Sequence, residues 1–273
     1  MKKATSFFGY PFFFISVIIF FYDLLPVINQ RIFSAENMDM SASAFYWRLY
    51  CFNKIRNFDF PLWNDSIFCG VTNIGNISSN MLYPLNCIFL IPDITLASNL
   101  SFITHFFIAG SGMIFFLRQL KLSFLSCAAG ALAFTFSAPV VLQACSGHIN
   151  ILSVISWTGF IFGAAYKLYE KPDLISTVVL SLFISLAFLA GHFQVYFYIM
   201  IMLSIYIVLI LFFGAHDKYR KYKVIIFYIL AVVISVCLCA AQILPVIEFS
   251  SVSGRAKAPF EFCSEFSLPF EIL

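Results

Sequence analysis

Seven apolar segments constrain this chain more than any other feature of its sequence. They cover residues 7–25, 96–117, 122–144, 149–166, 174–190, 193–213 and 224–244. A helix needs roughly 20 apolar residues to cross a hydrocarbon layer about 30 Å thick, so each segment is long enough to span a membrane. Apart from Asp23 near the end of the first, none contains an acidic or basic residue. The pattern predicts an all-α polytopic membrane protein with about seven transmembrane helices.

The overall composition agrees with a membrane location. Hydrophobic residues make up 62% of the chain and charged residues only 11%, whereas soluble proteins carry roughly 45–50% and about 25%. The formal net charge is +3 and is scattered along the chain, which does not indicate a nucleic-acid surface. We therefore expect membrane lipids among the partners and no nucleic acid.

Basic residues in the connections predict the orientation. They are Lys2, Lys3, Arg118, Lys121, Lys167, Lys171, Lys218, Arg220, Lys221 and Lys223, and with seven crossings they all fall on one side. The positive-inside rule makes that side cytoplasmic. We expect an N-terminal anchor helix (1–28), an extracytoplasmic loop (29–95), transmembrane helices two to seven (96–244) and an extracytoplasmic tail (245–273). The chain is then a multi-pass protein of the cell (cytoplasmic) membrane, with its N-terminus inside and its C-terminus outside.

The first outer loop is far longer than the roughly 2–8 residues common between packed helices, so it is expected to carry function. Residues 58–64 and 81–85 are rich in aromatic side chains and are predicted to form short interfacial helices. Cysteines in polar stretches, namely Cys51, Cys69, Cys87 and Cys263, could form a disulfide in an oxidising compartment, but the sequence assigns no pairing.

The unusual polar residues gather on the predicted outer face. They are Asp23, Glu36, Asp39, His148, His192, Gln194, Gln242, Glu248 and Arg255. A transporter would place polar groups near the membrane midplane, so an interfacial site is the better interpretation. Glu36 and Asp39 stand three apart, which puts both carboxylates on one face if that piece is helical. They fit a general base or a metal ligand; the alternative is a pair of solvated loop acids.

Other polar positions have a functional and a structural interpretation side by side. His148 and His192 each follow a glycine at an outer helix end, where they could face a phosphate or be interfacial aromatics. His105 inside the second segment predicts a bond between helices. The last helix is expected to stop at Pro245. Arg255 beyond it suits a phosphate, or anionic headgroups equally well.

Several short motifs together resemble a known family. They are Pro61-Leu62-Trp63-Asn64, Gly70, Tyr83-Pro84, Gly147-His148, Gly191-His192-Phe193-Gln194, Ala241-Gln242-Ile243-Leu244-Pro245 with Glu248, and Ser253-Gly254-Arg255. In this order they resemble the YfhO-type bacterial membrane proteins, which are placed among the GT-C-type glycosyltransferases. The likeness extends from about Asp39 to Arg255.

The resemblance implies a glycosyltransferase that moves a sugar from a polyprenyl-phosphate donor to a cell-envelope acceptor on the extracytoplasmic face. It implies Asp39 as catalytic base, with Glu36 beside it. It implies substrate binding by Trp63, Asn64, His148, His192, Gln194, Gln242, Glu248 and Arg255. A divalent metal ion, Mg²⁺ or Mn²⁺, is an optional cofactor in this interpretation.

The chain departs from the pattern of this family. Asp65, Thr72 and Phe193 stand where prolines are expected. Relatives of this type are longer and have more spans, so the chain is expected to be a truncated or split member. The alternative functions are a lipid or small-molecule transporter or flippase, and an inactive truncated scaffold. The sugar, the acceptor and the oligomeric state stay open at this stage.

Overall fold

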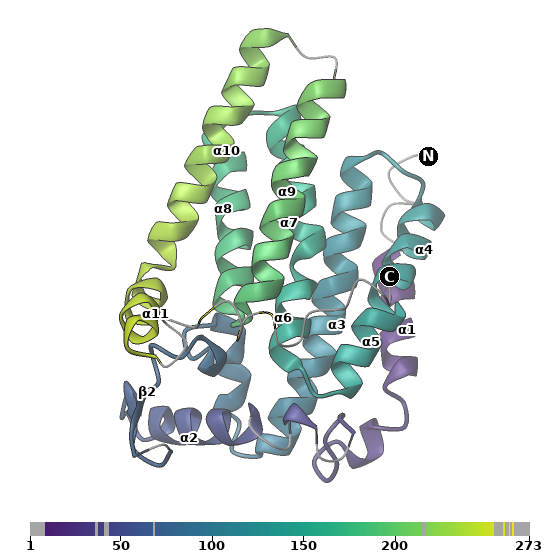
Figure 1. The fold of residues 1–273 in the computed structure, drawn as a ribbon. Helices are drawn as coiled ribbons and strands as arrows, with labels where there is room; N and C mark the ends of the chain where they lie inside the picture. The colour runs from purple at the N-terminus through teal and green to yellow at the C-terminus, as the bar shows by residue number, and fades with distance from the viewer. Residues whose placement is uncertain are drawn as a thin grey trace.

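The computed structural model describes residues 9–35, 38–40, 44–67, 69–214 and 217–253, with residues 259, 262 and 264. Most of these residues are helical, and a bundle of roughly upright helices forms the body of the molecule (Figure 1). The first loop, with α2 (Phe45–Arg56), covers one end of this bundle. The predicted all-α architecture is therefore confirmed.

Among the described residues, four helices are long and apolar enough to cross a membrane. They are α3 (Ile94–Gln119), α6 (Ile149–Ser156) continued by α7 (Thr158–Glu170), α9 (Phe193–Phe213) and α10 (Lys218–Leu238). A fifth span results if α4 (Phe124–Thr135) and α5 (Ala138–Cys145), which meet at a 42° bend, count as one. The helices α1 (Gly9–Phe20) and α8 (Leu174–Leu189) are apolar but shorter. Several helices could thus span a membrane, whereas the number seven stays a prediction.

The seventh predicted segment is divided into two helices. The helix α10 ends at Leu238, and α11 (Ala240–Val252) begins after a break at Cys239. The prediction that the helix stops at Pro245 is wrong, because Pro245 lies inside α11. The chain has already turned at Cys239, so Pro245 removes one backbone donor from the second turn of a new helix without ending it.

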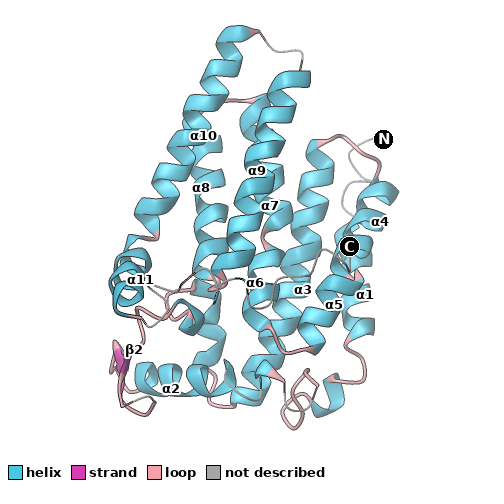
Figure 2. Ribbon diagram, in the orientation of Figure 1, coloured by secondary structure: helices cyan, strands magenta, loops and turns pink. Residues whose placement is uncertain are grey.

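The 3₁₀ helix η2 (Leu25–Val27) precedes the first loop, which contains α2, the 3₁₀ helices η4 (Ile77–Ser79) and η5 (Pro84–Leu90), and the strands β1 (Trp63–Asn64) and β2 (Val71–Thr72). The two strands pair antiparallel, and β2 is visible beside α2 (Figure 2). The interfacial helix predicted for 58–64 is therefore wrong. Phe58 has φ 57°, and Pro61 forces the residue before it out of helical geometry. The second predicted helix, 81–85, overlaps η5.

The centre of the bundle is α3, which packs against α1, α4, α6 and α7. Its closest approach is to α7, because a Cβ atom on Gly159 would lie 2.3 Å from the carbonyl carbon of Gly112. The two backbones therefore touch, which small residues permit.

A buried chain of hydrogen bonds fastens the first loop to this core. The hydroxyl of Tyr83 lies 3.0 Å from Nε2 of His105 on α3 and accepts a bond of 2.8 Å from Nε1 of Trp157. Nδ1 of His105 lies 2.7 Å from the carbonyl oxygen of Ser101. A neutral ring with its proton on Nδ1 satisfies all three bonds. The predicted bond between helices thus runs through a loop tyrosine that joins α3 to α7.

The basic connections lie at the end of the bundle away from the loop. The turns between α3 and α4, α7 and α8, and α9 and α10 are all at the end opposite α2 (Figure 1). They carry Arg118, Lys171 and Lys218. This separation matches the predicted pattern of charge; which end faces the cytoplasm stays a prediction.

Candidate functional site

Two glycine corners occupy the loop end of the bundle. Gly147 has φ 73° and Gly191 has φ 88°, a left-handed conformation that favours glycine. His148 follows the first corner as the N-terminal residue flanking α6, and His192 follows the second as the N-cap of α9. The two Gly-His turns are therefore confirmed as helix boundaries, with each histidine opening the next helix.

The first loop packs directly on both corners. A Cβ atom on Gly147 would lie 2.7 Å from the backbone nitrogen of Met40, and one on Gly191 would lie 2.7 Å from the carbonyl oxygen of Ile77. Backbone cannot move aside as a flexible side chain does, so the loop seats only because both corners lack a side chain. These contacts bring loop residues beside two turns that are distant in sequence.

A pocket of about 340 Å³, here called the polar pocket, lies where the loop meets the corners. Its lining includes Asp39, Ala44, Trp47, His148, Asn150 and His192. The acid that the sequence singled out and both histidines thus share one cavity. They come from three separate parts of the chain, which indicates a ligand site.

Asp39 and His148 are hydrogen-bonded within the polar pocket. Nε2 of His148 lies 3.0 Å from Oδ2 of Asp39. Nδ1 of the same ring lies 2.5 Å from Oε1 of Gln143 on α5. The imidazole is therefore held from both sides and donates its Nε2–H to the carboxylate. The side chain of Asp39 is 68% exposed, so a ligand can reach the carboxylate from the open side.

His192 has a different environment. Its Nδ1 accepts a bond of 3.3 Å from the backbone N–H of Val195, which caps α9. Burial lowers the pKa of His192, and the neighbouring charge of His148 lowers it further. The ring is therefore neutral at neutral pH, and its second nitrogen carries a proton that it can donate.

A buried arginine stands behind the polar pocket. Arg48 on α2 is 1% exposed. Its Nη1 donates to the carbonyl oxygen of Ala44 at 3.0 Å. Its Nη2 donates to Oδ1 of Asn80 at 3.3 Å and to Oδ1 of Asn150 at 2.5 Å. Among the described residues, Arg48 has no carboxylate partner.

The two asparagines extend this network to both corners. Nδ2 of Asn80 donates to the carbonyl oxygen of Ala190 at 3.0 Å. Nδ2 of Asn150 donates to the carbonyl oxygen of Ser78 at 3.0 Å and lies 3.5 Å from that of Gly191. Arg48 therefore lies at the junction of α2, the start of α6 and, through Asn80, the turn before α9.

Sequence reasoning missed Arg48, Asn80 and Asn150. A single arginine in a loop is normally exposed, which hides a buried one. One signal was available: Arg48 lies within the aromatic run Phe45-Tyr46-Trp47 and Tyr50, a composition that indicates a packed helix rather than a solvated loop.

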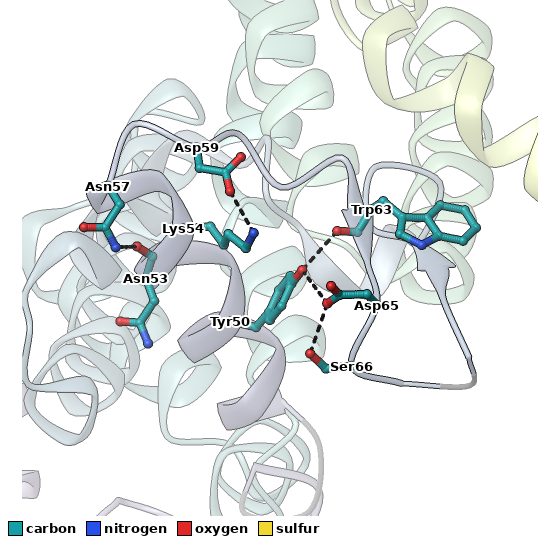
Figure 3. Close-up of polar contacts among 8 residues, drawn as sticks. All are labelled: Tyr50, Asn53, Lys54, Asn57, Asp59, Trp63, Asp65 and Ser66. Carbon is teal, nitrogen blue, oxygen red and sulfur yellow. Dashed lines mark hydrogen bonds and ion pairs between the residues drawn. The ribbon is translucent and has the colours of Figure 1, made fainter.

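Trp63 and Asn64 lie apart from the lining of the polar pocket. Trp63 is 58% exposed and Asn64 is buried. The hydroxyl of Tyr50 donates to the carbonyl oxygen of Trp63 at 3.1 Å and lies 3.4 Å from a carboxylate oxygen of Asp65 (Figure 3). These contacts tie the β1–β2 hairpin to α2. In the structure, Trp63 and Asn64 thus belong to the hairpin that packs on α2.

Three other predicted residues also lie outside the pocket lining. Gln194 is exposed and donates to the hydroxyl of Tyr198 at 2.8 Å. Gln242 is 2% exposed and donates to the carbonyl oxygen of Ile74, which fastens α11 to the loop. Glu248 is exposed on α11.

Glu36 and Arg255 fall outside the described residues. Asp23 lines a separate pocket of about 430 Å³ together with Arg31. Within the described ranges, no three His, Cys, Asp or Glu side chains are grouped to hold a metal ion. Of the described residues that line the polar pocket, Asp39 alone carries a carboxylate, whereas Mg²⁺ and Mn²⁺ prefer several oxygen ligands.

A second cavity of about 620 Å³ is here called the apolar groove. Its lining includes Ile77, Phe193, Tyr196, Val236, Cys239 and Ile247. Ile77 and Phe193 are the direct sequence neighbours of Ser78 and His192, which line the polar pocket. The same two short segments thus contribute to the walls of both cavities.

Comparisons with known protein families, with curated proteins and with solved structures find no match to this chain. The likeness to YfhO-type proteins therefore rests on the motifs alone.

Proposed function

We propose that the chain is a membrane glycosyltransferase that moves a sugar from a polyprenyl-phosphate donor to a cell-envelope acceptor on the extracytoplasmic face. The observation that best supports this proposal is the polar pocket, where Asp39, His148 and His192 meet, together with the apolar groove that shares two wall segments with it. A lipid-linked sugar has the same two parts, a polar head and a long hydrocarbon chain. The position of the pocket, at the loop end of apolar helices, suits a ligand that stays in the bilayer.

The carboxylate of Asp39 is the base in this proposal. The acceptor hydroxyl gives its proton to Asp39 as its oxygen bonds to the anomeric carbon. The bond between that carbon and the phosphate oxygen breaks at the same time, and polyprenyl phosphate leaves with the electron pair. A positioned base of this kind contributes about 10²–10⁴-fold to the rate.

His148 has the role of positioning that base. Its Nε2–H holds Oδ2 of Asp39 at 3.0 Å, and Gln143 fixes the ring from the other side. This contact holds one carboxylate oxygen of Asp39 in place and orients the group toward the acceptor hydroxyl. The neutral His192 supplies an N–H donor to the same cavity. These groups are aimed before the substrate arrives, which is the main source of electrostatic catalysis.

The test is Asp39→Asn in the full chain reconstituted with a polyprenyl-phosphate sugar and an acceptor. We expect sugar transfer to fall by about 10²–10⁴-fold, because Asn cannot take the proton. The matched control is Asp59→Asn, since Asp59 is an exposed acid of the same loop that pairs with Lys54. Unchanged turnover in Asp39→Asn would reject the base.

A flippase gives a different result in the same vesicles. It would move labelled lipid between leaflets at equal rates in the wild type and in Asp39→Asn, with no sugar transfer. A scaffold would show neither activity. Either result would overturn the proposed glycosyl transfer.

A further inference from the structure

We propose that the polar pocket is a phosphate-binding site built from the buried charge of Arg48 and the first turns of α6 and α9. This proposal deepens the proposed function, and it rests on that function only for the lipid chain attached to the phosphate. Neither the motifs nor the predicted site residues assign this role to Arg48.

Arg48 carries a positive charge that no carboxylate among the described residues offsets. Arg48 donates to neutral oxygens of Ala44, Asn80 and Asn150, and its Nε has no partner among the described residues. Burial lowers the pKa of Arg48 only to about 10, so it stays protonated at neutral pH. Burial also raises the pKa of the neighbouring Cys51 thiol to about 11, which keeps that group neutral. A buried cation without a counter-ion is costly, and a bound anion relieves that cost.

The charge of Arg48 lies close behind the wall of the polar pocket. Arg48 is one residue behind the pocket wall, because its partners Ala44 and Asn150 both line the polar pocket. The next residue along α2, Trp47, lines it as well. Neutral, low-dielectric groups separate the guanidinium from the cavity, and a charge acts strongly across such a medium.

The helices α6 and α9 both begin at the polar pocket. Ile149, Asn150 and Ile151, the first turn of α6, line the polar pocket, and so does His192 at the start of α9. The first N–H groups of a helix have no partner inside it, and the N-terminus carries a partial positive charge. Phosphates bind at such ends.

Among the described residues, the titratable groups that line the cavity are Asp39, His148 and His192. The carboxylate of Asp39 is engaged by His148, whose Nε2 lies 3.0 Å from Oδ2. The charge of Arg48 behind the wall and the partial charges of the two helix ends are all of the sign that attracts an anion. The volume of about 340 Å³ lies at the lower end of the roughly 300–1,000 Å³ of ligand pockets, and the apolar groove, which shares two wall segments with the pocket, favours a phosphate that carries a lipid chain.

The experiment measures binding to the full chain in nanodiscs of neutral phosphatidylcholine. The probes are polyprenyl phosphate, polyprenol of equal length, and inorganic phosphate. We expect polyprenyl phosphate to bind at least tenfold more tightly than polyprenol, and inorganic phosphate to compete with it. Competition by inorganic phosphate would show that the phosphate group, and not only the lipid chain, contributes to the affinity. Equal binding of the two lipids would overturn the proposal.

A pair of variants tests Arg48 without removing it. Ala44→Glu puts a carboxylate on the pocket wall beside the guanidinium, and Ala44→Gln puts a neutral group of the same size there. We expect the Glu variant to bind polyprenyl phosphate at least tenfold more weakly than the Gln variant. Arg56→Gln on the same helix, outside the pocket lining, should bind as the wild type does. Equal affinity in the two Ala44 variants would refute the role of Arg48.

The failure of this proposal and that of the proposed function can be told apart. Asp39→Asn removes the base and leaves the buried cation in place, so it should retain polyprenyl-phosphate binding while it loses transfer. Phosphate-selective binding without any sugar transfer in the wild type would reject the enzyme and keep the site. Transfer without phosphate-selective binding would reject the site and keep the enzyme.

Discussion

Replacing Tyr83 with Phe removes one oxygen atom from the buried chain that joins the first loop to α3 and α7. That oxygen accepts the Nε1–H of Trp157 at 2.8 Å and lies 3.0 Å from Nε2 of His105. Tyr83 is 1% exposed, His105 0% and Trp157 7%. Water therefore cannot take the place of the lost hydroxyl, and two polar groups are left without a partner.

The cost follows from these two groups. Hydrogen bonds in membrane helices average about 0.6 kcal/mol each, whereas an orphaned buried group in a soluble core costs about 1–3 kcal/mol. Two groups at the loop end of the bundle then cost about 1–6 kcal/mol in the free energy of unfolding. For a chain of this size, that loss lowers the midpoint of thermal unfolding by roughly 2–10 °C.

The assay heats the purified protein in detergent and follows the monodisperse fraction by size-exclusion chromatography. Tyr46→Phe is the matched control, because Tyr46 lies in the same loop and is 61% exposed; its midpoint should not change. The triple variant Tyr83→Phe, His105→Leu, Trp157→Phe removes every partner of the lost hydroxyl. Its loss of thermal stability should be smaller than the sum of the losses of the three single variants, because no polar group is then left without a partner.

An unchanged midpoint in Tyr83→Phe would refute this reasoning. So would a triple variant whose loss equals the sum of the three single losses, since the bonds would then not be coupled.

Two further predictions concern packing and pH. Gly159→Ala should lower stability by about 1–3 kcal/mol, because the new methyl group meets the backbone of Gly112; Gly130→Ala, which meets only the flexible end of Leu117, should cost less in the same thermal assay. Burial lowers the pKa of His192 below 6.5, so below that pH the unfolded chain binds more protons than the folded one. The midpoint of the wild type should therefore fall as the pH is lowered from about 7 to about 5, and His192→Asn, which keeps a capping side chain, should show a smaller fall; equal pH profiles would contradict the assignment.

Hydropathy located the bundle helices well, because a span needs a long apolar run and such a run depends only on the residues within it. The convergence of Asp39 with His148 and His192 followed from alternation, since every second connection of a bundle returns to the same end. The sequence therefore predicted that these three residues lie at the same end of the bundle. The hydrogen bond between Asp39 and His148 could not be foreseen, because it depends on how Met40 packs on Gly147.

What escaped prediction depends on contacts between distant parts of the chain. Arg48 and Asn150 are 102 residues apart, and no local pattern announces their bond. Cys51 lies in a stretch that reads as polar, yet it is 0% exposed because α2 turns this face to the core. It accepts a contact from Asn73 at 3.2 Å. The break at Cys239 likewise needs tertiary contacts, with Gln242 drawn to the loop at Ile74.

The apolar groove has a consequence for how a ligand would reach the chain. Phe193, Val236 and Ile247 on its wall are 57%, 49% and 60% exposed, and with these helices in a bilayer such surfaces meet acyl chains. A ligand held there arrives by diffusion within the plane of the membrane. Its effective concentration is the number of carrier molecules per lipid, so diluting the carrier with inert lipid slows encounter, whereas adding buffer does not.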